Sequence, residues 1–150
     1  MPEKRTLERA KQDEREGKAP STQAGEFVRE EIEHIREGKH GARSTQQAIA
    51  IGLSKARRAG VDLPPPARGS TSARTRQHAA RDYAKGRTSE GTRPPSVKRA
   101  RATRKALKQE GSRAASRTAL AAQARAAARR RPAAARSASA RKAASTRKRK

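Results

Sequence analysis

The sequence predicts a mainly α-helical protein in which a short helical hairpin is followed by a largely disordered, helix-prone basic tail. Large apolar residues are scarce, since Leu, Ile, Val and Phe together make up 13 of 150 residues. So little apolar surface does not offset the entropy lost when a whole chain of this length becomes ordered. Nine of the 15 apolar side chains larger than Ala lie between Phe27 and Leu63. We therefore expect the core in that segment.

Charge divides the chain in the same way. Residues 1–37 hold 8 basic and 10 acidic side chains, whereas residues 67–150 hold 26 basic and 3 acidic ones. The whole chain has a formal net charge of +25. A polycation of this strength indicates a polyanionic partner, and nucleic acid is the usual one. The triple proline at residues 64–66, which no helix can cross, marks the boundary between the two parts.

These observations predict five segments along the chain. They are an N-terminal charged helix at residues 1–20, the helical hairpin at 21–63, a Pro/Gly-rich linker with a short helix at 64–95, a basic helix-prone segment at 96–131 and a disordered basic arm at 132–150.

The first helix of the hairpin is expected at residues 22–37. Ser21 or Thr22 would cap its beginning, and Gly38 lies where a glycine commonly ends a helix. Its apolar face follows helical spacing and consists of Ala24, Phe27, Val28, Ile32 and Ile35. The opposite face is expected to be solvated and carries Glu26, Arg29, Glu30, Glu33 and Arg36.

The second helix is expected at residues 45–59. Ser44 and Gln47 have the spacing of a capping box, and Gly60 with Val61 has the pattern of a Schellman ending. Small residues recur every four positions and predict a groove for the first helix, at Ala48, Gly52 and Ala56. Two helices alone bury too little apolar surface for a stable fold. We therefore expect the hairpin to dimerise, to pack on a protein partner or to fluctuate.

The tail contains three further helix-prone stretches. They are residues 73–85, ended by Gly86, residues 97–110, ended by Gly111, and residues 112–131, ended by Pro132. Like charges four positions apart disfavour these helices in isolation, so they are expected to fold when phosphates neutralise them. Residues 133–150 have no acidic and no large apolar residue and are expected to be disordered.

The candidate nucleic-acid-binding residues are the basic side chains of the second helix, its preceding loop and the tail. They are Lys39, Arg43, Lys55, Arg57, Arg58, Lys98, Arg99, Arg101, Arg104, Lys105, Lys108, Arg129, Arg130, Arg131, Arg141, Lys142, Arg147, Lys148, Arg149 and Lys150. One Tyr, one Phe and no Trp provide no stacking platform for single strands. Duplex DNA is therefore favoured, with RNA as the other option, and nothing indicates that base sequence is read.

Two more specific interpretations of the hairpin stay open. The helix at residues 45–59 would act as a recognition helix if the pair were a helix-turn-helix. Alternatively, the amide end of this helix, beside Lys39 and Arg43, would hold a backbone phosphate. The loop at residues 38–45 has the letters of a nucleotide-binding phosphate loop in the wrong order, which argues against a nucleotide hydrolase.

The sequence predicts no enzyme. Cysteine is absent, and the three histidines, His34, His40 and His78, show no ligand spacing, so no metal site, cofactor or catalytic residue is expected. No apolar run approaches the length of a membrane span, and the N-terminus lacks the apolar stretch of a secretory signal. We expect no membrane partner and a cytoplasmic, nucleoid-associated location.

Residues 21–32, 38–44 and 47–54, which read STQAGEFVREEI, GKHGARS and QAIAIGLS, resemble a family of small, uncharacterised bacterial proteins. Members are sometimes labelled as plasmid-stabilisation or DNA-binding proteins. The resemblance covers about residues 1–66 and implies no particular catalytic or binding residue. The tail is similar in composition to the histone H1-like tails of bacterial nucleoid proteins, although the Lys-Lys-Pro repeats common in such tails are absent.

Two functions follow as expectations. The first is non-enzymatic, sequence-nonspecific binding of nucleic acid, chiefly duplex DNA, of the nucleoid-associated or plasmid-maintenance type. The alternative is a protein-interaction module, in which the hairpin binds a partner while the tail only localises it to the nucleoid or the ribosome.

Overall fold

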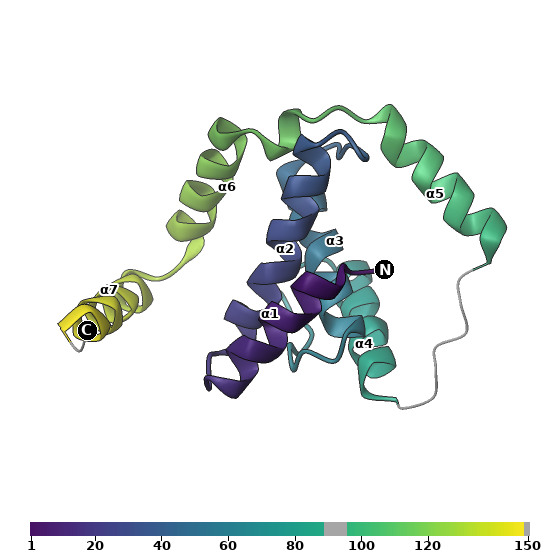
Figure 1. The fold of residues 1–150 in the computed structure, drawn as a ribbon. Coiled ribbons are helices and arrows are strands. Elements are labelled where there is room, and N and C mark those ends of the chain that lie inside the picture. Colours follow the sequence, from purple (N-terminus) through teal and green to yellow (C-terminus); the bar gives the residue numbers. More distant parts are fainter. Residues whose placement is uncertain (89–95, 149–150) are drawn as a thin grey trace. The chain divides into compact units, whose positions relative to one another are not determined.

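The computed structural model describes residues 1–88 and 96–148, and every regular element within them is a helix. The chain forms two compact units, Met1–Ala115 and Ser116–Lys150. The helices, which Figure 1 labels, are α1 (Lys4–Arg15), α2 (Pro20–Arg36), α3 (Thr45–Arg58), α4 (Ala73–Arg87), α5 (Val97–Gln109), the 3-10 helix η1 (Arg113–Ala115), α6 (Arg117–Arg130) and α7 (Ala133–Lys148). None of these helices has the length and apolar character of a membrane span.

Helices α2 and α3 form the predicted hairpin and approach each other closely. A Cβ atom placed on Gly52 would lie 2.7 Å from Cα of Val28, so only glycine fits at this crossing. Ala48 and Ala56, one turn to either side, are fully buried. The groove predicted from these three small residues is confirmed.

Both helices end as the sequence predicts. Gly38 has φ +71°, its N–H donates to the carbonyl of Ile35 at 3.2 Å, and Lys39 N donates to the carbonyl of His34 at 2.9 Å. The same Schellman pair of hydrogen bonds closes α3 at Gly60, where the following Val61 is buried.

The observed beginnings of α2 and α3 agree less well with the predicted ones. Helix α2 starts at Pro20, with Ala19 as its N-cap and no side-chain cap, so the predicted caps Ser21 and Thr22 are wrong. Proline fits the first helical position because its φ is preset and its missing N–H has no partner there. At α3, Ser44 Oγ accepts from Gln47 N at 3.2 Å as predicted, but Gln47 Oε1 accepts from Arg43 N rather than from Ser44 N.

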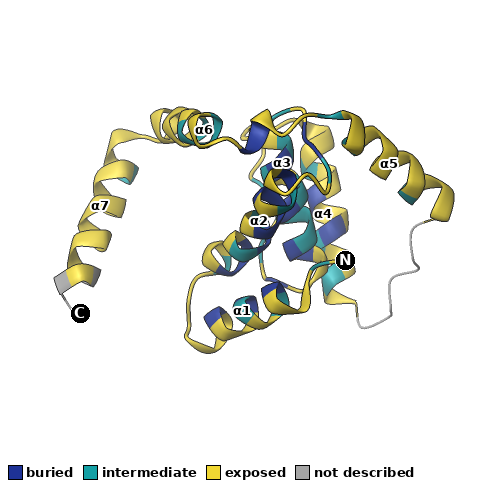
Figure 2. Cartoon of the chain, turned by 45° about the horizontal axis from the view of Figure 1, so that its top comes forward, coloured by how far each residue is buried: buried dark blue, intermediate teal, exposed yellow. Residues whose placement is uncertain are grey.

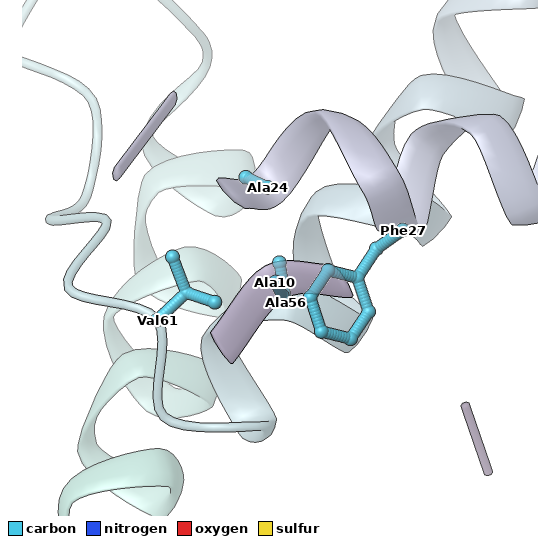
Figure 3. Close-up of a cluster of buried hydrophobic side chains, with 5 residues drawn as sticks. All are labelled: Ala10, Ala24, Phe27, Ala56 and Val61. Atoms are coloured by element: carbon cyan, nitrogen blue, oxygen red, sulfur yellow. The ribbon is translucent and has the colours of Figure 1, made fainter. Parts of the chain in front are cut away.

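Two further helices cover the hairpin, since α1 packs on α2 and α4 packs on α3. The apolar cluster between them contains one aromatic ring, Phe27, which lies beside small residues (Figure 3). Its buried members are Ala10, Ala24, Phe27, Ala56 and Val61, and Leu7, Leu53 and Leu63 pack around it. The chain itself therefore provides packing that was expected from a second copy or a protein partner.

The triple proline at residues 64–66 is followed by a return of the chain to the hairpin. Arg57 Nε donates to the carbonyl of Leu63 at 3.0 Å, and Arg58 Nε pairs with Asp82 of α4 at 2.7 Å. The sequence predicted that this helix would end before Gly86, but Gly86 lies inside α4, which continues to Arg87. A Cβ there would be 1.9 Å from the carbonyl oxygen of Arg57, so this glycine permits the close approach of α4 to the end of α3.

The expectation of a largely disordered tail is wrong. Residues 97–109, 117–130 and 133–148 are helical, and α7 occupies the segment expected to be a disordered arm. Ala, Arg and Lys are strong helix formers, and a like-charge pair costs only a few tenths of a kcal/mol, about 0.2–0.5. In α7 no two cations are three or four residues apart, so this penalty does not arise there.

The largest difference from the predicted boundaries of the tail helices lies after α5. The stretch predicted as a single helix at residues 112–131 is divided into η1 and α6, because Ser116 Oγ accepts from Ala119 N and begins a new helix. Pro94 and Pro95, at the end of the predicted linker, lie outside the described residues, as do the candidate cations Arg149 and Lys150.

Candidate nucleic-acid interface

Helix α5 presents cations to solvent. It has no buried residue, it contains no acidic side chain, and its surface is exposed along most of its length (Figure 2). Its C-terminal end is held by backbone contacts, since Gly41 N donates to the carbonyl of Leu107 at 2.8 Å and Ala42 N donates to the carbonyl of Gly111 at 3.2 Å. The exposed cations are Lys98, Arg99, Arg101, Arg104, Lys105 and Lys108.

The unit at Ser116–Lys150 contains 12 Lys and Arg and no Asp or Glu. Helix α6 buries no residue, and Figure 2 shows both α6 and α7 exposed along most of their surfaces. The exposed candidate cations of this unit are Arg129, Arg130, Arg131, Arg141, Lys142 and Arg147, and Lys148 ends α7. Cations without acidic residues in the same unit create a positive potential that attracts phosphate polymers.

The candidate cations of α3 and its preceding loop are placed differently, because most of them contact groups of the protein itself. Lys39 Nζ lies 2.9 Å from a carboxylate oxygen of Glu37 and 3.3 Å from one of Glu3, and these carboxylates raise the pKa of Lys39. Arg57 is buried, and Arg58 pairs with Asp82. Arg43 is exposed. Lys39 and Arg58 differ from the tail cations in having acidic partners, all of which except Glu37 are far away in the sequence.

Helix α3 offers little exposed surface either for a recognition helix or for a phosphate site at its N-terminus. Only Gln46, Ala50 and Arg58 are exposed along it, whereas a recognition helix needs a continuous exposed face. At its N-terminus the hydroxyl of buried Thr45 donates to the carbonyl of Ala114 at 2.7 Å. The segment around η1 therefore covers the end at which a phosphate was expected.

A buried ion-pair network lies where α1, α2 and α3 meet. Lys55 Nζ is 2.7 Å from Glu31 Oε2 and 3.1 Å from Glu30 Oε1. Glu31 is 1% exposed and Glu30 is 3% exposed, so the prediction that Glu30 lies on a solvated face is wrong. The segment before α1 covers it, and the backbone N–H of Glu3 donates to Glu30 Oε2 at 2.9 Å.

Lys55 and Glu30 hold their charged forms despite burial. Burial alone would lower the pKa of Lys55, but the adjacent carboxylates of Glu31 and Glu30 outweigh it and raise this pKa. Burial alone would raise the pKa of Glu30, but the N–H of Glu3, the hydroxyl of Thr6 and the ammonium of Lys55 together lower it. Lys55, a candidate for phosphate contact, is therefore engaged inside the fold.

The lowered pKa of Glu30 predicts sensitivity to acid. A carboxylate with a lowered folded-state pKa contributes stability that is present above its unfolded pKa, about 4.3, and is lost as the pH falls through its folded value. We expect the free energy of unfolding to fall less steeply below about pH 5 in Glu30→Gln than in the unsubstituted protein. Urea unfolding at several pH values measures this slope, with the exposed Glu33→Gln as the matched control. Equal slopes in all three proteins would contradict the prediction.

Two histidines come together at the end of α2. The ring centroids of His34 and His40 are 6.2 Å apart, and one ligand atom from each, with a carboxylate oxygen of Glu31, lie within 4.8 Å of one another. The absence of ligand spacing in the sequence did not indicate this proximity, which arises because the Schellman turn at Gly38 returns the chain over the last turn of α2. The sequence signal was the Glu31–His34 spacing of three, which places both side chains on one helix face.

Comparison with known proteins identifies one similarity. Residues 4–67 match the model of a family of unknown function (DUF6496), a segment that contains α1, α2 and α3. No curated protein and no solved structure shows a significant match to the chain. The similarity is thus to an uncharacterised domain, and the helices from α4 to α7 lie outside it.

Proposed function

We propose that the protein is a non-enzymatic, sequence-nonspecific nucleic-acid-binding protein of the nucleoid-associated or plasmid-maintenance type. The observation that carries the proposal is the composition and exposure of the second unit. Every charged residue of Ser116–Lys150 is basic. Helix α6 has no buried residue, so packing within the chain does not account for its basic residues. Helix α5 adds six exposed cations.

Release of condensed counterions would drive the binding. Each phosphate neutralised on duplex DNA contributes about −0.9 to the slope of log K against log salt concentration. The second unit contains no aromatic residue, so stacking on single-stranded bases has no platform there. Duplex DNA is therefore the expected ligand, and structured RNA is the alternative that the experiment below distinguishes.

The alternative function, a hairpin that binds a protein partner, has less support. It was motivated by the small amount of apolar surface that two helices alone would bury. Helices α1 and α4 pack on the hairpin, and α3 retains three exposed residues.

Charge neutralisation in the second unit tests the proposal. The triple variant Arg129→Gln, Arg130→Gln, Arg141→Gln removes three exposed cations and should reduce the magnitude of the salt slope for a DNA duplex by about 2.7, if each contacts one phosphate. The control Lys4→Gln, Arg5→Gln, Lys11→Gln removes the same charge from the exposed surface of α1 and should leave the slope unchanged. Fluorescence anisotropy over a range of salt concentrations measures both.

Three results would contradict the proposal. They are a failure to bind duplex DNA at low salt, a salt slope that is close to zero, and equal effects of the two triple variants. Two duplexes of equal length and different sequence should bind with similar affinity, and a tenfold difference would contradict nonspecific binding. A structured RNA measured alongside shows whether RNA or DNA is preferred.

A further inference from the structure

A cluster of potential metal ligands lies at the junction of α2 with the loop that follows it, apart from the cationic helices. Glu31 and His34 lie on α2, and His40 follows the Schellman turn. Nε2 of His40 is 3.2 Å from Glu31 Oε1. Tetrahedral zinc, with bonds of about 2.0–2.1 Å, separates its ligand atoms by about 3.3 Å. This pair therefore already has the spacing that a shared ion requires.

The carboxylate of Glu31 is buried without a hydrogen bond. Its side chain is 1% exposed, and neither oxygen has a hydrogen-bond partner among the described residues. Lys55 Nζ pairs with Oε2 at 2.7 Å, whereas Oε1 lies 3.2 Å from Nε2 of His40. A buried carboxylate oxygen without a hydrogen bond is costly, and coordination through Oε1 would satisfy it while Oε2 continues to face Lys55.

The surroundings of the two rings match those of metal-binding histidines. Nδ1 of His40 is 3.1 Å from the carbonyl oxygen of Gly41. A carbonyl oxygen only accepts, so Nδ1–H donates in this contact, and in the tautomer that carries its proton on Nδ1 alone the lone pair of Nε2 is available to an ion. At His34, Glu3 Oε1 lies 2.7 Å from Nε2. Carbonyl and carboxylate contacts of this kind orient metal-binding imidazoles in proteins. The side chains of His34 and His40 are 14% and 16% exposed, so an ion would enter from solvent.

The charge of the connected network favours a cation. Its carboxylates belong to Glu3, Glu30, Glu31 and Glu37, and its ammonium groups belong to Lys39 and Lys55. With neutral imidazoles these groups sum to a net charge of −2, in a protein whose net charge is +25. A divalent cation would balance this local excess.

We propose that Glu31, His34 and His40 bind one divalent transition-metal ion of the zinc type. One carboxylate and two imidazoles are ligands that zinc and its neighbours bind, whereas Mg²⁺ and Ca²⁺ prefer oxygen alone. Three protein ligands leave a fourth position for water. The bound ion would fasten the loop between α2 and α3 to the end of α2, and so stabilise the first unit.

Calorimetric titration of Zn²⁺ into chelator-treated full-length protein without a histidine tag tests the proposal. We expect one ion per chain together with a rise in Tm. His40→Ala should weaken zinc binding at least tenfold and abolish the rise in Tm. The control is His78→Ala, which removes an exposed histidine of α4 that lies outside the cluster, and it should bind zinc as the unsubstituted protein does.

Cobalt gives a second measurement, because the visible absorption of bound Co²⁺ reports the geometry of its ligands. We expect a tetrahedral or five-coordinate spectrum in the unsubstituted protein and in His78→Ala, and its loss in His40→Ala. Far-UV circular dichroism without metal checks that the variant is folded, and His34→Ala replaces it if it is not. Absence of zinc binding by the unsubstituted protein, or equal losses in His40→Ala and His78→Ala, would overturn the proposal.

Discussion

Replacing Lys55 with Ala is expected to lower the free energy of unfolding of the first unit by about 3–5 kcal/mol. Its ammonium lies within 3.1 Å of both Glu30 and Glu31, and both carboxylates are buried. Removing it leaves two like charges next to each other, away from water and without a counter-charge. Loss of one partner from a buried ion pair costs far more than loss of a surface pair, because the remaining charge has no solvent to stabilise it.

Lys39→Ala is the matched control. Lys39 also lies between two carboxylates, those of Glu3 and Glu37, but all three side chains are about half exposed. Its replacement should therefore cost no more than about 1 kcal/mol. Urea unfolding followed by the fluorescence of Tyr83, the single tyrosine, reports on the first unit alone. A chelator excludes compensation by metal. Equal losses in the two variants would contradict the burial of the Glu30–Glu31 pair.

Lys55 also shows what the sequence could not reveal. Helical periodicity predicted α2, α3 and their glycine endings, because those features depend on neighbours within one turn. The partners of Lys55 are 24 and 25 residues away, and only the crossing of α2 and α3 brings them together. Lys55 lies close to Arg57 and Arg58 in the sequence. This local sequence would be the same whether the lysine paired with carboxylates inside the fold or faced a phosphate outside it.

Both covering helices were predicted as helices, but their packing on the hairpin was difficult to predict for a related reason. Helices α1 and α4 bury small or polar residues such as Ala10 and Ala79, which give almost no apolar signal. In the tail, the scarcity of large apolar residues led to an expectation of disorder. The helices there depend instead on the propensity of alanine and on cation spacing. The candidate cations of α5 are exposed, whereas their binding to nucleic acid stays a prediction.

Two glycines in the hairpin should respond to alanine with opposite signs. Both lie within helices, Gly25 in α2 and Gly52 in α3, so alanine removes the same backbone entropy cost, about 0.5–1 kcal/mol, at each. At Gly25 a Cβ meets nothing within 4 Å. Gly25→Ala is therefore expected to raise the free energy of unfolding by about that amount.

At Gly52 the new Cβ would lie 2.7 Å from Cα of Val28 and 3.0 Å from its backbone N. These are backbone atoms, which no side-chain rotation moves away, so α2 and α3 would have to separate. Separation would loosen the contacts of buried Ala48 and Ala56 along the same groove, and overpacking of this kind costs about 1–3 kcal/mol. Gly52→Ala should thus be destabilising despite its better helix propensity, by the same Tyr83 measurement. If both substitutions stabilise the protein equally, the helices cross at a larger distance, and the groove of small residues does not hold the hairpin together.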